Sequence, residues 1–368
     1  MSLYIYQRAG WPFFEWDESL LSPLLGKVRY LQGKIAGRME GVGISVRTET
    51  TLKNLTDDIL KSTEIEGEVL NPLQVRSSIA RRLGIEIAGL VPSDRNVDGV
   101  VEMMLDATQK YTDKLTRERL WGWQSSLFPS GWSGMYQVVT GNWRDNTKGP
   151  MQVVSGPLGR ERIHYQAPSA ELIDDEMSLF FRWFNNDTDT LDPVIKAGIA
   201  HLWFVTIHPF DDGNGRIARA LTDMQLARAE QNTQRYYSMS TQIRLERKSY
   251  YDILEKTQKS SLDITQWLEW FLSCLYTALQ TSDEMLSTIL QKALFWEKHK
   301  ETLLNERQRL MIIKLQDGIE GKLSSSKWAK MAKCSQDTAG RDIQDLIEKG
   351  ILQKEDAGGR STSYYLVV

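Results

Sequence analysis

Apolar residues recur every three or four positions along most of the chain, which is the spacing of an amphipathic helix. The first run spans residues 20–39 and stops at the glycine-containing segment 41–43. Gly67 and Pro72 mark two further boundaries, because glycine favours the end of a helix and proline its first turn. The pattern predicts four more helices before residue 128, over residues 50–66, 72–84, 97–112 and 115–127. The N-terminal third of the chain is therefore predicted to be helical.

The segment 129–168 interrupts this helical pattern. It is rich in glycine, proline, serine and asparagine, and it contains two short strand-like runs, Met-Gln-Val-Val and Arg-Ile-His-Tyr-Gln. The glycine-containing stretch between these runs is typical of a turn, so the sequence predicts a β-hairpin over residues 150–166. Helical periodicity resumes at Ser169 and continues to about Glu301.

Residues 303–368 show a different organisation, in which three short helical patterns precede a strand, a Gly-Gly turn and a second strand. Ser335 is placed to cap the third helix and Gly350 to end it. This order of elements is typical of a winged helix-turn-helix. The sequence thus predicts an N-terminal helical domain, a central domain, and a winged-helix domain with a linker helix, over residues 1–115, 116–285 and 286–368.

The charge balance is close to neutral, with 45 lysine and arginine residues, 48 aspartate and glutamate residues and a net charge of −3. This excludes a strongly basic, nucleic-acid-binding coat over the whole chain. Cys274 and Cys334 are too few for a disulfide framework or a zinc cluster, which fits a reducing compartment. The N-terminus lacks the pattern of a signal peptide, and no apolar stretch approaches the roughly 18 residues of a membrane span. We therefore expect a cytoplasmic protein with no membrane partner.

The densest chemistry lies in residues 208–219, which read His-Pro-Phe-Asp-Asp-Gly-Asn-Gly-Arg-Ile-Ala-Arg. A new helix is predicted to begin at the glycines, where backbone N–H groups can approach an anion. Arg216 and Arg219 are natural partners for phosphate oxygens. The aspartates are candidate magnesium ligands, and the histidine is a candidate general base. Each feature alone also occurs in ordinary turns and helix ends, but together they predict a phosphoryl- or nucleotidyl-transfer site.

The same twelve residues resemble the signature of the Fic family, His-x-Phe-x-Asp/Glu-Gly-Asn-Gly-Arg-x-x-Arg, at every specified position. The resemblance extends over about residues 116–285, with a hairpin before the motif and helices on both sides of it. It implies a mainly α, Fic-type helical core in which the hairpin over residues 150–166 is a flap. It also implies a nucleotidyltransferase that moves AMP from ATP to a Ser, Thr or Tyr hydroxyl of a target protein or of itself.

The resemblance implies a role for each specified residue of the motif. His208 would take the proton from the incoming hydroxyl, Phe210 would anchor the loop in the core, and Asp212 would coordinate Mg²⁺ at the phosphates. The other five would bind the phosphates of ATP: Gly213, Asn214 and Gly215 as an anion hole, Arg216 on the phosphate chain and Arg219 on the γ-phosphate. Relatives that transfer phosphate are understood to carry alanine in place of Gly213, so the glycine favours AMP transfer.

The resemblance also implicates residues outside the motif. The flap would hold the target segment over the site by strand addition. Tyr250 and Tyr251 would line the adenine pocket, with packing in the core as an equally good interpretation. His201, on the helix before the motif, has no cysteine or third histidine near it in sequence, so we interpret it as a hydrogen-bonded core residue.

An upstream segment fits the family's inhibitory pattern, Ser/Thr-x-x-x-Glu-Gly/Asn, with Ser62, Glu66 and Gly67 at the specified positions. The resemblance implies that Glu66 pairs with Arg219 and so occupies the guanidinium that the ATP γ-phosphate needs. The same residues also fit an ordinary helix end. We therefore expect an auto-inhibited protein adenylyltransferase with an inhibitory helix in its N-terminal domain.

Three alternatives stay open from the sequence. In the first, the same site removes AMP from a modified protein, with Glu66 orienting a water. In the second, the donor is another nucleotide or phosphate compound. In the third, the chain is a DNA-binding regulator that senses a nucleotide. The recognition helix of the winged helix carries Arg341 and Lys349 against four acidic residues, Asp337, Asp342, Asp345 and Glu348. Because DNA affinity is mostly electrostatic, a protein-interaction or homodimerisation module is favoured over DNA binding.

Overall fold

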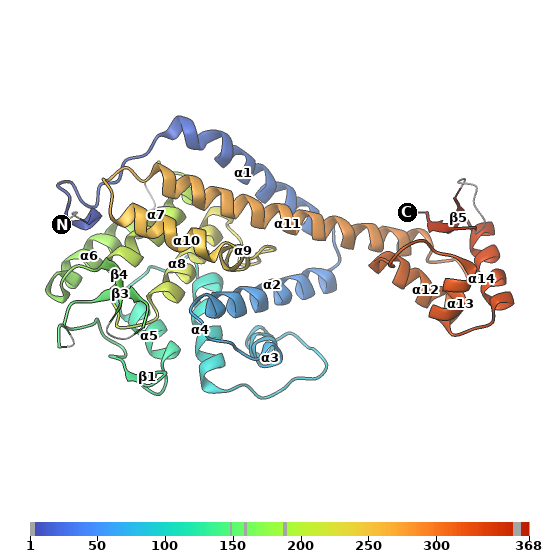
Figure 1. Ribbon diagram of the computed structural model, residues 1–368, viewed down its shortest axis with the longest axis horizontal. Helices are drawn as coiled ribbons and strands as arrows, with labels where there is room; N and C mark the ends of the chain where they lie inside the picture. The colour runs from blue at the N-terminus through green and yellow to red at the C-terminus, as the bar shows by residue number, and fades with distance from the viewer. Residues whose placement is uncertain (1–3, 148, 158–159, 187–189, 356–361, 368) are drawn as a thin grey trace. The chain divides into compact units, whose positions relative to one another are not determined.

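The computed structural model describes residues 4–147, 149–157, 160–186, 190–355 and 362–367. The chain divides into two compact units, Met1–Asp283 and Glu284–Val368, and the division falls inside the long helix α11 (Thr265–Lys298). The first unit is mainly helical and carries small β-hairpins (Figure 1). Segments 1–115 and 116–285, which the sequence suggested as separate domains, therefore lie almost entirely in one unit.

The first unit is built around two helices that pack against each other, α7 (Pro193–Ile207) and α8 (Asn214–Glu230). Residues 194–207 of α7 are all buried, because nearly every face of this helix is apolar. Most of α8 is also buried, although α8 carries arginines and an aspartate. Buried charges are tolerated only when they are paired, so the charged residues of α8 require partners inside the protein.

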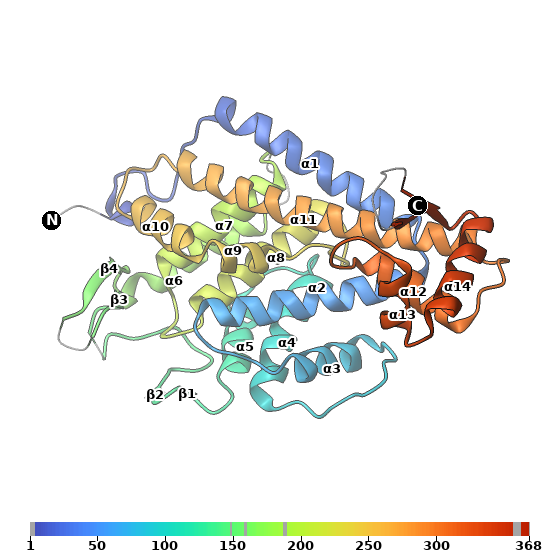
Figure 2. The ribbon, with the colours of Figure 1, turned by 45° about the vertical axis from the view of Figure 1, so that its right-hand side comes forward.

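The N-terminal residues form α1 (Glu18–Glu40), α2 (Ile44–Ile65) and α3 (Pro72–Leu83). Figures 1 and 2 both show α1 running alongside the first part of α11, where Lys34 and Arg38 pair with Asp283. The helix α2 begins at Ile44 rather than at the predicted residue 50. Its first two turns bury no side chain, so the sequence shows no apolar stripe there.

The two predicted helices that follow are also present, as α4 (Arg95–Gln109) and α5 (Arg117–Leu127). They pack with an unusually close approach of their backbones. A methyl group on Gly99 of α4 would lie 1.7 Å from the carbonyl oxygen of Ser126 on α5. Only glycine therefore fits at this position.

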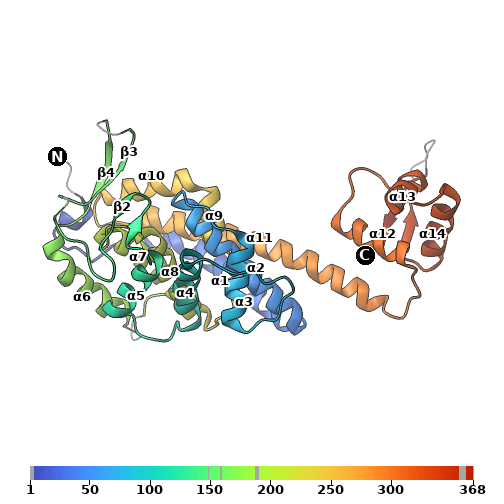
Figure 3. The ribbon, with the colours of Figure 1, turned by 90° about the horizontal axis from the view of Figure 1, so that it is seen from below.

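The predicted hairpin is present as β3 (Gln152–Ser155) and β4 (Arg162–Gln166), which pair antiparallel with a bulge between Val153 and Val154. Figure 3 shows it extending away from the helices, with α10 alongside. The Tyr165 hydroxyl donates to the carbonyl of Thr206, 2.6 Å away, and so fastens β4 to the end of α7. Residues 158 and 159 of the expected flap lie outside the described residues. A second, shorter hairpin, β1 (Trp132–Ser133) and β2 (Tyr136–Gln137), precedes it.

The remaining elements of the first unit are α6 (Ile173–Phe184), α9 (Met239–Leu245), α10 (Arg247–Gln258), and the short 3-10 turns η1 (Ile5–Gln7) and η2 (Ala170–Leu172). Together with the helices above, they confirm the predicted mainly α fold. Among the described residues, no helix combines the length and the apolar character that crossing a bilayer requires.

The second unit follows the predicted order of three helices and a hairpin: α12 (Glu306–Asp317), α13 (Ser325–Ala332), α14 (Gln336–Glu348), β5 (Leu352–Lys354) and β6 (Tyr364–Leu366). Its core forms around Trp328, which is fully buried among Met311, Ile343 and Leu346. Ser335 caps α14 as expected, because its hydroxyl accepts from the Thr338 N–H. The Gly-Gly turn predicted between the strands lies outside the described residues.

Two acidic residues of α14 have partners within the second unit, which the sequence did not indicate. Asp342 is buried and accepts hydrogen bonds from Asn305 and Arg307, at 3.0 Å from each. Asp345 accepts from Gln308 at 2.7 Å and pairs with Lys349. These carboxylates satisfy donors at the start of α12, so they cannot be counted as free negative charge on the exposed surface of α14.

The close approach of α4 and α5 gives a test of the fold. Replacing Gly99 with alanine forces the two helices apart and should destabilise the first unit by about 3 kcal/mol, the upper part of the range for overpacking. The matched control is Gly122→Ala on α5, where a methyl group would meet nothing within 4 Å. It should be neutral or stabilising by up to about 1 kcal/mol, because alanine is the better helix former. Scanning calorimetry measures both; equal thermal midpoints for the two variants would contradict the packing described.

Candidate active site

The candidate site lies where α7 ends and α8 begins, and His208 is the residue that ends α7. Its backbone is left-handed, with φ of 53°, and its carbonyl accepts a hydrogen bond from Arg144 Nε at 2.7 Å. The ring atom Nδ1 lies 3.2 Å from the carbonyl oxygen of Val205. Because a carbonyl can only accept, Nδ1 must carry the proton and Nε2 is left with a lone pair. The imidazole is thus held in the tautomer that a base requires.

The surroundings of His208 keep its ring neutral. Burial lowers the pKa of His208 to about 4, the backbone contact with Val205 opposes this, and the charge of Arg144 lowers the pKa further. The negative charges of Asp212 and Glu66 raise the pKa, but by less than burial lowers it. At neutral pH the ring is therefore unprotonated and able to accept a proton.

The loop after His208 is anchored as the sequence suggested. Phe210 is fully buried, and its ring packs against Trp143 with centroids 5.0 Å apart. The side chain of Asn214 closes the loop: Oδ1 accepts from the Phe210 N–H at 3.0 Å, and Nδ2 donates to the Phe210 carbonyl at 2.8 Å. The side-chain amide of Asn214 is thus committed to the loop, which leaves its backbone N–H for the predicted anion-hole role.

The first turn of α8 has the geometry of an anion-binding helix start. Its first backbone bond within the helix runs from Ile217 N–H to the Gly213 carbonyl, at 3.0 Å, so the N–H groups of residues 214–216 precede that bond. Gly213 has φ of 88°, and a methyl group there would lie 3.0 Å from Leu127 and 3.1 Å from Phe128. The left-handed backbone favours glycine at this position, and the neighbouring side chains leave little room for a methyl group.

The two arginines of the motif are deeply buried, each with 2% of its surface exposed. Among the described residues, Arg216 Nε and Arg219 Nη1 have no hydrogen-bond acceptor. A buried guanidinium N–H without an acceptor costs free energy of about 1–3 kcal/mol. Two such donors at the start of one helix point to a site built for an anionic ligand.

Asp212 is half-buried beside this helix start. Its Oδ1 accepts from the Gly213 N–H at 2.6 Å, and its Oδ2 accepts from the Ser133 hydroxyl at 2.5 Å, which ties the loop to β1. No group of three or more His, Cys, Asp or Glu residues that could hold a metal is found in the described part of the chain. A lone carboxylate suits a cation whose other ligands are water and substrate phosphates, which is how proteins commonly hold Mg²⁺.

The end of α2 reaches into the site and meets Arg219. The guanidinium Nη2 lies 2.8 Å from Glu66 Oε1 and donates to the Ser62 carbonyl at 2.8 Å, while Nε donates to the Ser62 hydroxyl at 2.8 Å. The contact between Glu66 and Arg219 that the resemblance implied is therefore present. A methyl group on Gly215 would lie 2.2 Å from Glu66 Oε1, so the carboxylate rests directly against the first turn of α8.

The end of α2 is held by its own turn and by α10. The Glu68 N–H bonds to the Thr63 carbonyl at 3.2 Å, and the Gly67 N–H bonds to the Glu64 carbonyl at 3.1 Å, which is a Schellman cap. Gly67 has φ of 88°, as this cap requires. From α10, Arg247 Nε donates to the Ile65 carbonyl at 2.8 Å. The orphan carbonyls of the helix end are thus satisfied while Glu66 stays in place.

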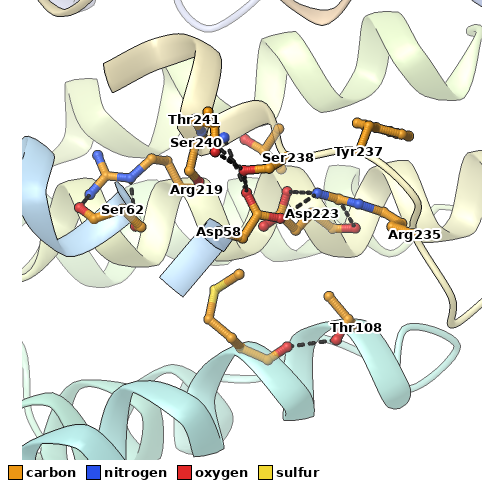
Figure 4. A network of polar contacts seen from close by, with 12 residues as sticks. Asp58, Ser62, Thr108, Arg219, Asp223, Arg235, Tyr237, Ser238, Ser240 and Thr241 are labelled. Carbon is orange, nitrogen blue, oxygen red and sulfur yellow. Dashed lines mark hydrogen bonds and ion pairs between the residues drawn. The ribbon is translucent and has the colours of Figure 1, made fainter. Parts of the chain in front are cut away.

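A buried ionic cluster fastens α2 to α8 further along (Figure 4). Arg235 Nη2 lies 2.5 Å from Asp223 on α8 and 3.3 Å from Asp58 on α2. The Ser238 hydroxyl donates to Asp58 at 2.6 Å, and the Ser240 N–H donates to it at 3.2 Å. Burial raises the pKa of Asp223, which the charge of Arg235 opposes. The cluster fixes the position from which Ser62 and Glu66 reach Arg219.

The two tyrosines proposed for the adenine pocket lie in different environments. Tyr250 is only 2% exposed, and its hydroxyl lies 2.8 Å from Nε2 of His201, whose Nδ1 lies 2.9 Å from the Thr222 hydroxyl. Tyr250 is therefore a core residue rather than a residue of an open pocket, and His201 is the hydrogen-bonded core histidine that we expected. Tyr251 is 37% exposed and lies beneath the guanidinium of Arg247. Of the two tyrosines, Tyr251 is therefore the one that stays a predicted residue of the adenine pocket.

Several positioning residues escaped the sequence reasoning. Ser133 ends the short strand β1 and Arg144 lies in a loop, 79 and 64 positions before the residues that they hold, and neither belongs to a motif. Asp58 and Arg235 are 177 positions apart. No sequence pattern connects these two residues.

Two family models match the chain. The Fic/DOC family model matches residues 114–226, and a domain of unknown function, DUF4172, matches residues 4–85. The chain is 33% identical over 96 residues to "Protein adenylyltransferase fic-1" of Caenorhabditis elegans and 35% identical over 99 residues to "Protein adenylyltransferase Fic" of Drosophila melanogaster. These matches cover 26% and 27% of this chain and 18% of each relative, so the chain spans only a small part of the relatives' length.

Solved structures show a similar fold. A Fic family protein from Desulfovibrio desulfuricans matches with a TM-score of 0.50 and 21% identity, over 94% of this chain and 96% of that one. A Fic domain containing signaling protein from Bacteroides thetaiotaomicron matches with a TM-score of 0.52 and 20% identity, over 71% of this chain and 98% of that one. At these identities the likeness concerns the fold.

The ionic cluster between α2 and α8 should dominate the stability of this region. Arg235→Met leaves two carboxylates buried without their partner and should lower the free energy of unfolding by about 3–5 kcal/mol. Lys248→Met is the matched control, because the Lys248–Asp252 pair is exposed on α10. It should cost less than about 1 kcal/mol. Urea unfolding followed by circular dichroism measures the difference; similar small effects of both variants would contradict the assigned importance of the cluster.

Proposed function

We propose, from the match of residues 114–226 to the Fic/DOC family model, that the protein transfers AMP from ATP to a hydroxyl of a target protein and that Glu66 inhibits this transfer. The supporting observation is the set of groups at the start of α8. A neutral histidine, a carboxylate, a helix N-terminus and two buried arginines with unused N–H groups lie within twelve residues. Such a set suits a polyphosphate that reacts with a nucleophile.

The nucleotide would be bound mainly through its phosphates. The N–H groups of residues 214–216 and the guanidinium of Arg216 would bind the phosphate chain, and Arg219 the γ-phosphate. Asp212 would hold Mg²⁺, whose chemistry is to neutralise charge on the phosphates. Adenine would lie near Tyr251, the more exposed of the two tyrosines.

His208 would act as the general base. Its Nε2 lone pair takes the proton of the target hydroxyl as the oxygen forms a bond to the α-phosphorus. The bond between the α-phosphorus and the bridging oxygen breaks, and pyrophosphate leaves with that electron pair. Arg144 acts through the backbone, because its bond to the His208 carbonyl holds the left-handed conformation that aims the ring. The hairpin β3–β4 would hold the target segment by strand addition.

Glu66 would inhibit transfer by occupying Arg219, the residue that would otherwise bind the γ-phosphate. Its carboxylate takes Arg219 at 2.8 Å and lies against Gly215, where the phosphate chain would run. ATP then binds without its γ-phosphate contact and in a pose that does not align the α-phosphorus with the incoming hydroxyl. Release of this one side chain would allow the productive pose.

Transfer from ATP labelled at the α-phosphate tests the base, the inhibitor and the reaction together. With Mg²⁺, the wild type should label weakly, Glu66→Gly strongly, and Glu66→Gly/His208→Ala at least about 100-fold less than Glu66→Gly, because a positioned base contributes about 10²–10⁴-fold. Glu64→Gly is the matched control, since Glu64 lies on the same turn but pairs with Lys61 and Arg244. It should label like the wild type. A folded Glu66→Gly protein that takes no label from any substrate would refute the proposal.

The environment of His208 predicts an unusual pH profile. A histidine with an ordinary pKa of about 6.5 loses base activity below that pH, whereas a pKa of about 4 keeps the ring neutral through pH 5.5. Removing Glu66 takes away a charge that raises this pKa, so the pKa of His208 should be lower still in the variant. The kcat/KM of Glu66→Gly, which reports the free enzyme, should therefore stay within about twofold between pH 8 and 5.5. A fall of tenfold over this range, centred near pH 6.5, would contradict the assignment.

A further inference from the structure

A second carboxylate of the same segment reaches the other arginine of the motif. Glu68 Oε2 lies 2.9 Å from Arg216 Nη1. Two residues earlier, Glu66 holds Arg219 at 2.8 Å. The segment 66–68 therefore presents one carboxylate to each of the two guanidinium groups that the proposed function assigns to the phosphates of ATP.

The turn at Gly67 explains how both side chains reach the same surface. Arg216 and Arg219 are three positions apart on α8 and so project from one face of it. Residues two positions apart, such as Glu66 and Glu68, share a side only in an extended segment and not in a helix. Because the end of α2 is helical, another feature must bring the two glutamates together. The left-handed conformation of Gly67 in the Schellman cap reverses the chain, so Glu68 returns beside Glu66. A methyl group on Gly67 would meet nothing within 4 Å, so the glycine is required by its conformation alone.

The two ion pairs differ in their exposure. The Arg216 side chain is 3% exposed and Glu68 is 47% exposed, whereas the corresponding values are 2% for Arg219 and 30% for Glu66. Arg216 is further enclosed by Phe128, whose ring centre lies 5.0 Å from the guanidinium carbon. The arginine is thus fixed in the protein, and the carboxylate that neutralises it can leave for solvent.

Glu68 contributes little else to the structure. The end of α2 is held by the Schellman cap through the backbone of Glu68, by Arg247 at the Ile65 carbonyl, and by Arg219 at Ser62. None of these contacts uses the Glu68 carboxylate. Removing its charge should therefore leave α2 in place and change only the ionic environment of Arg216.

We propose that Glu68 is a second competing carboxylate, which occupies Arg216 in the absence of nucleotide and must be displaced by the phosphate chain of ATP. This inference rests on the proposed function, because it takes ATP as the anion that displaces Glu68. Glu68 and Glu66 then affect two different properties, the affinity for the nucleotide and the rate of transfer. Glu68 lowers nucleotide affinity, whereas Glu66 chiefly controls the pose of the γ-phosphate and hence the rate of transfer. Release of Glu66 alone leaves Arg216 paired, so ATP must still displace Glu68 in order to bind.

Equilibrium binding of ATP with Mg²⁺ tests this inference without any transfer step. In the His208→Ala background, Glu68→Gln should lower the Kd of ATP about two- to fivefold, which is the upper part of the range for a partly exposed ion pair. Glu68→Asp should lower it as well, because the shorter side chain keeps the charge but does not reach Arg216. Glu64→Gln is the matched control: it removes the same charge from the same turn, away from Arg216, and should leave the Kd unchanged.

Steady-state kinetics separates competition from a merely structural role. In the Glu66→Gly background, adding Glu68→Gln should lower the KM for ATP by the same factor as it lowers the Kd, with kcat unchanged. Unchanged affinity in Glu68→Gln, or equal tightening in Glu64→Gln, would overturn the inference while leaving the proposed function intact. Absence of ATP binding in every variant would overturn the proposed function and this inference with it.

Discussion

A buried guanidinium on the first turns of α8 is the constraint on which the arrangement of the first unit depends. Arg219 is almost fully enclosed, and a charge in that position is tolerated only with close partners. In this structure the partners are Ser62 and Glu66 from the end of α2. The helix α2 must therefore dock with its C-terminal end against α8, and the cluster of Asp58, Asp223 and Arg235 fixes it there. The same guanidinium would have to exchange Glu66 for a phosphate when the site works.

This exchange connects stability with regulation. The structure satisfies these arginines with carboxylates of its own chain, and in the proposed function the nucleotide would replace those carboxylates. The two states compete for the same donors, so any contact that stabilises the docked end of α2 also weakens nucleotide binding. The tautomer and the backbone conformation of His208 do not depend on this competition, because Val205 and Arg144 hold them.

Sequence reasoning was most successful where the chemistry is local. The motif at residues 208–219, the limits of α1 and α3 and the strands β3 and β4 follow from periodicity, caps and turn residues close in sequence. The predicted start of α2 was wrong because the first two turns of the helix bury no side chain and so carry no apolar pattern. The sequence did not decide the environments of Tyr250 and Asp342, because each has its partner on another element, His201 for Tyr250 and Arg307 for Asp342. No local pattern states which face of a helix a distant residue will cover.

The contact between Glu66 and Arg219 was a different case, since neither spacing nor periodicity connects residues 153 positions apart. It came from the resemblance of two short motifs to one family, and the structure contains the ion pair. Glu68 lies just beyond the inhibitory pattern, so that resemblance assigned it no role. Glu68 reaches Arg216 because the Schellman turn reverses the chain at Gly67.

The most direct test of the central claim is a double-mutant cycle on the free energy of unfolding in the absence of nucleotide. Glu66→Gln, Arg219→Gln and the double variant would be compared with the wild type by urea unfolding. If the docked end of α2 neutralises the buried arginine, the two substitutions should be coupled by about 1–3 kcal/mol. Effects that add to within about 0.3 kcal/mol, as for residues that do not interact, would contradict the account.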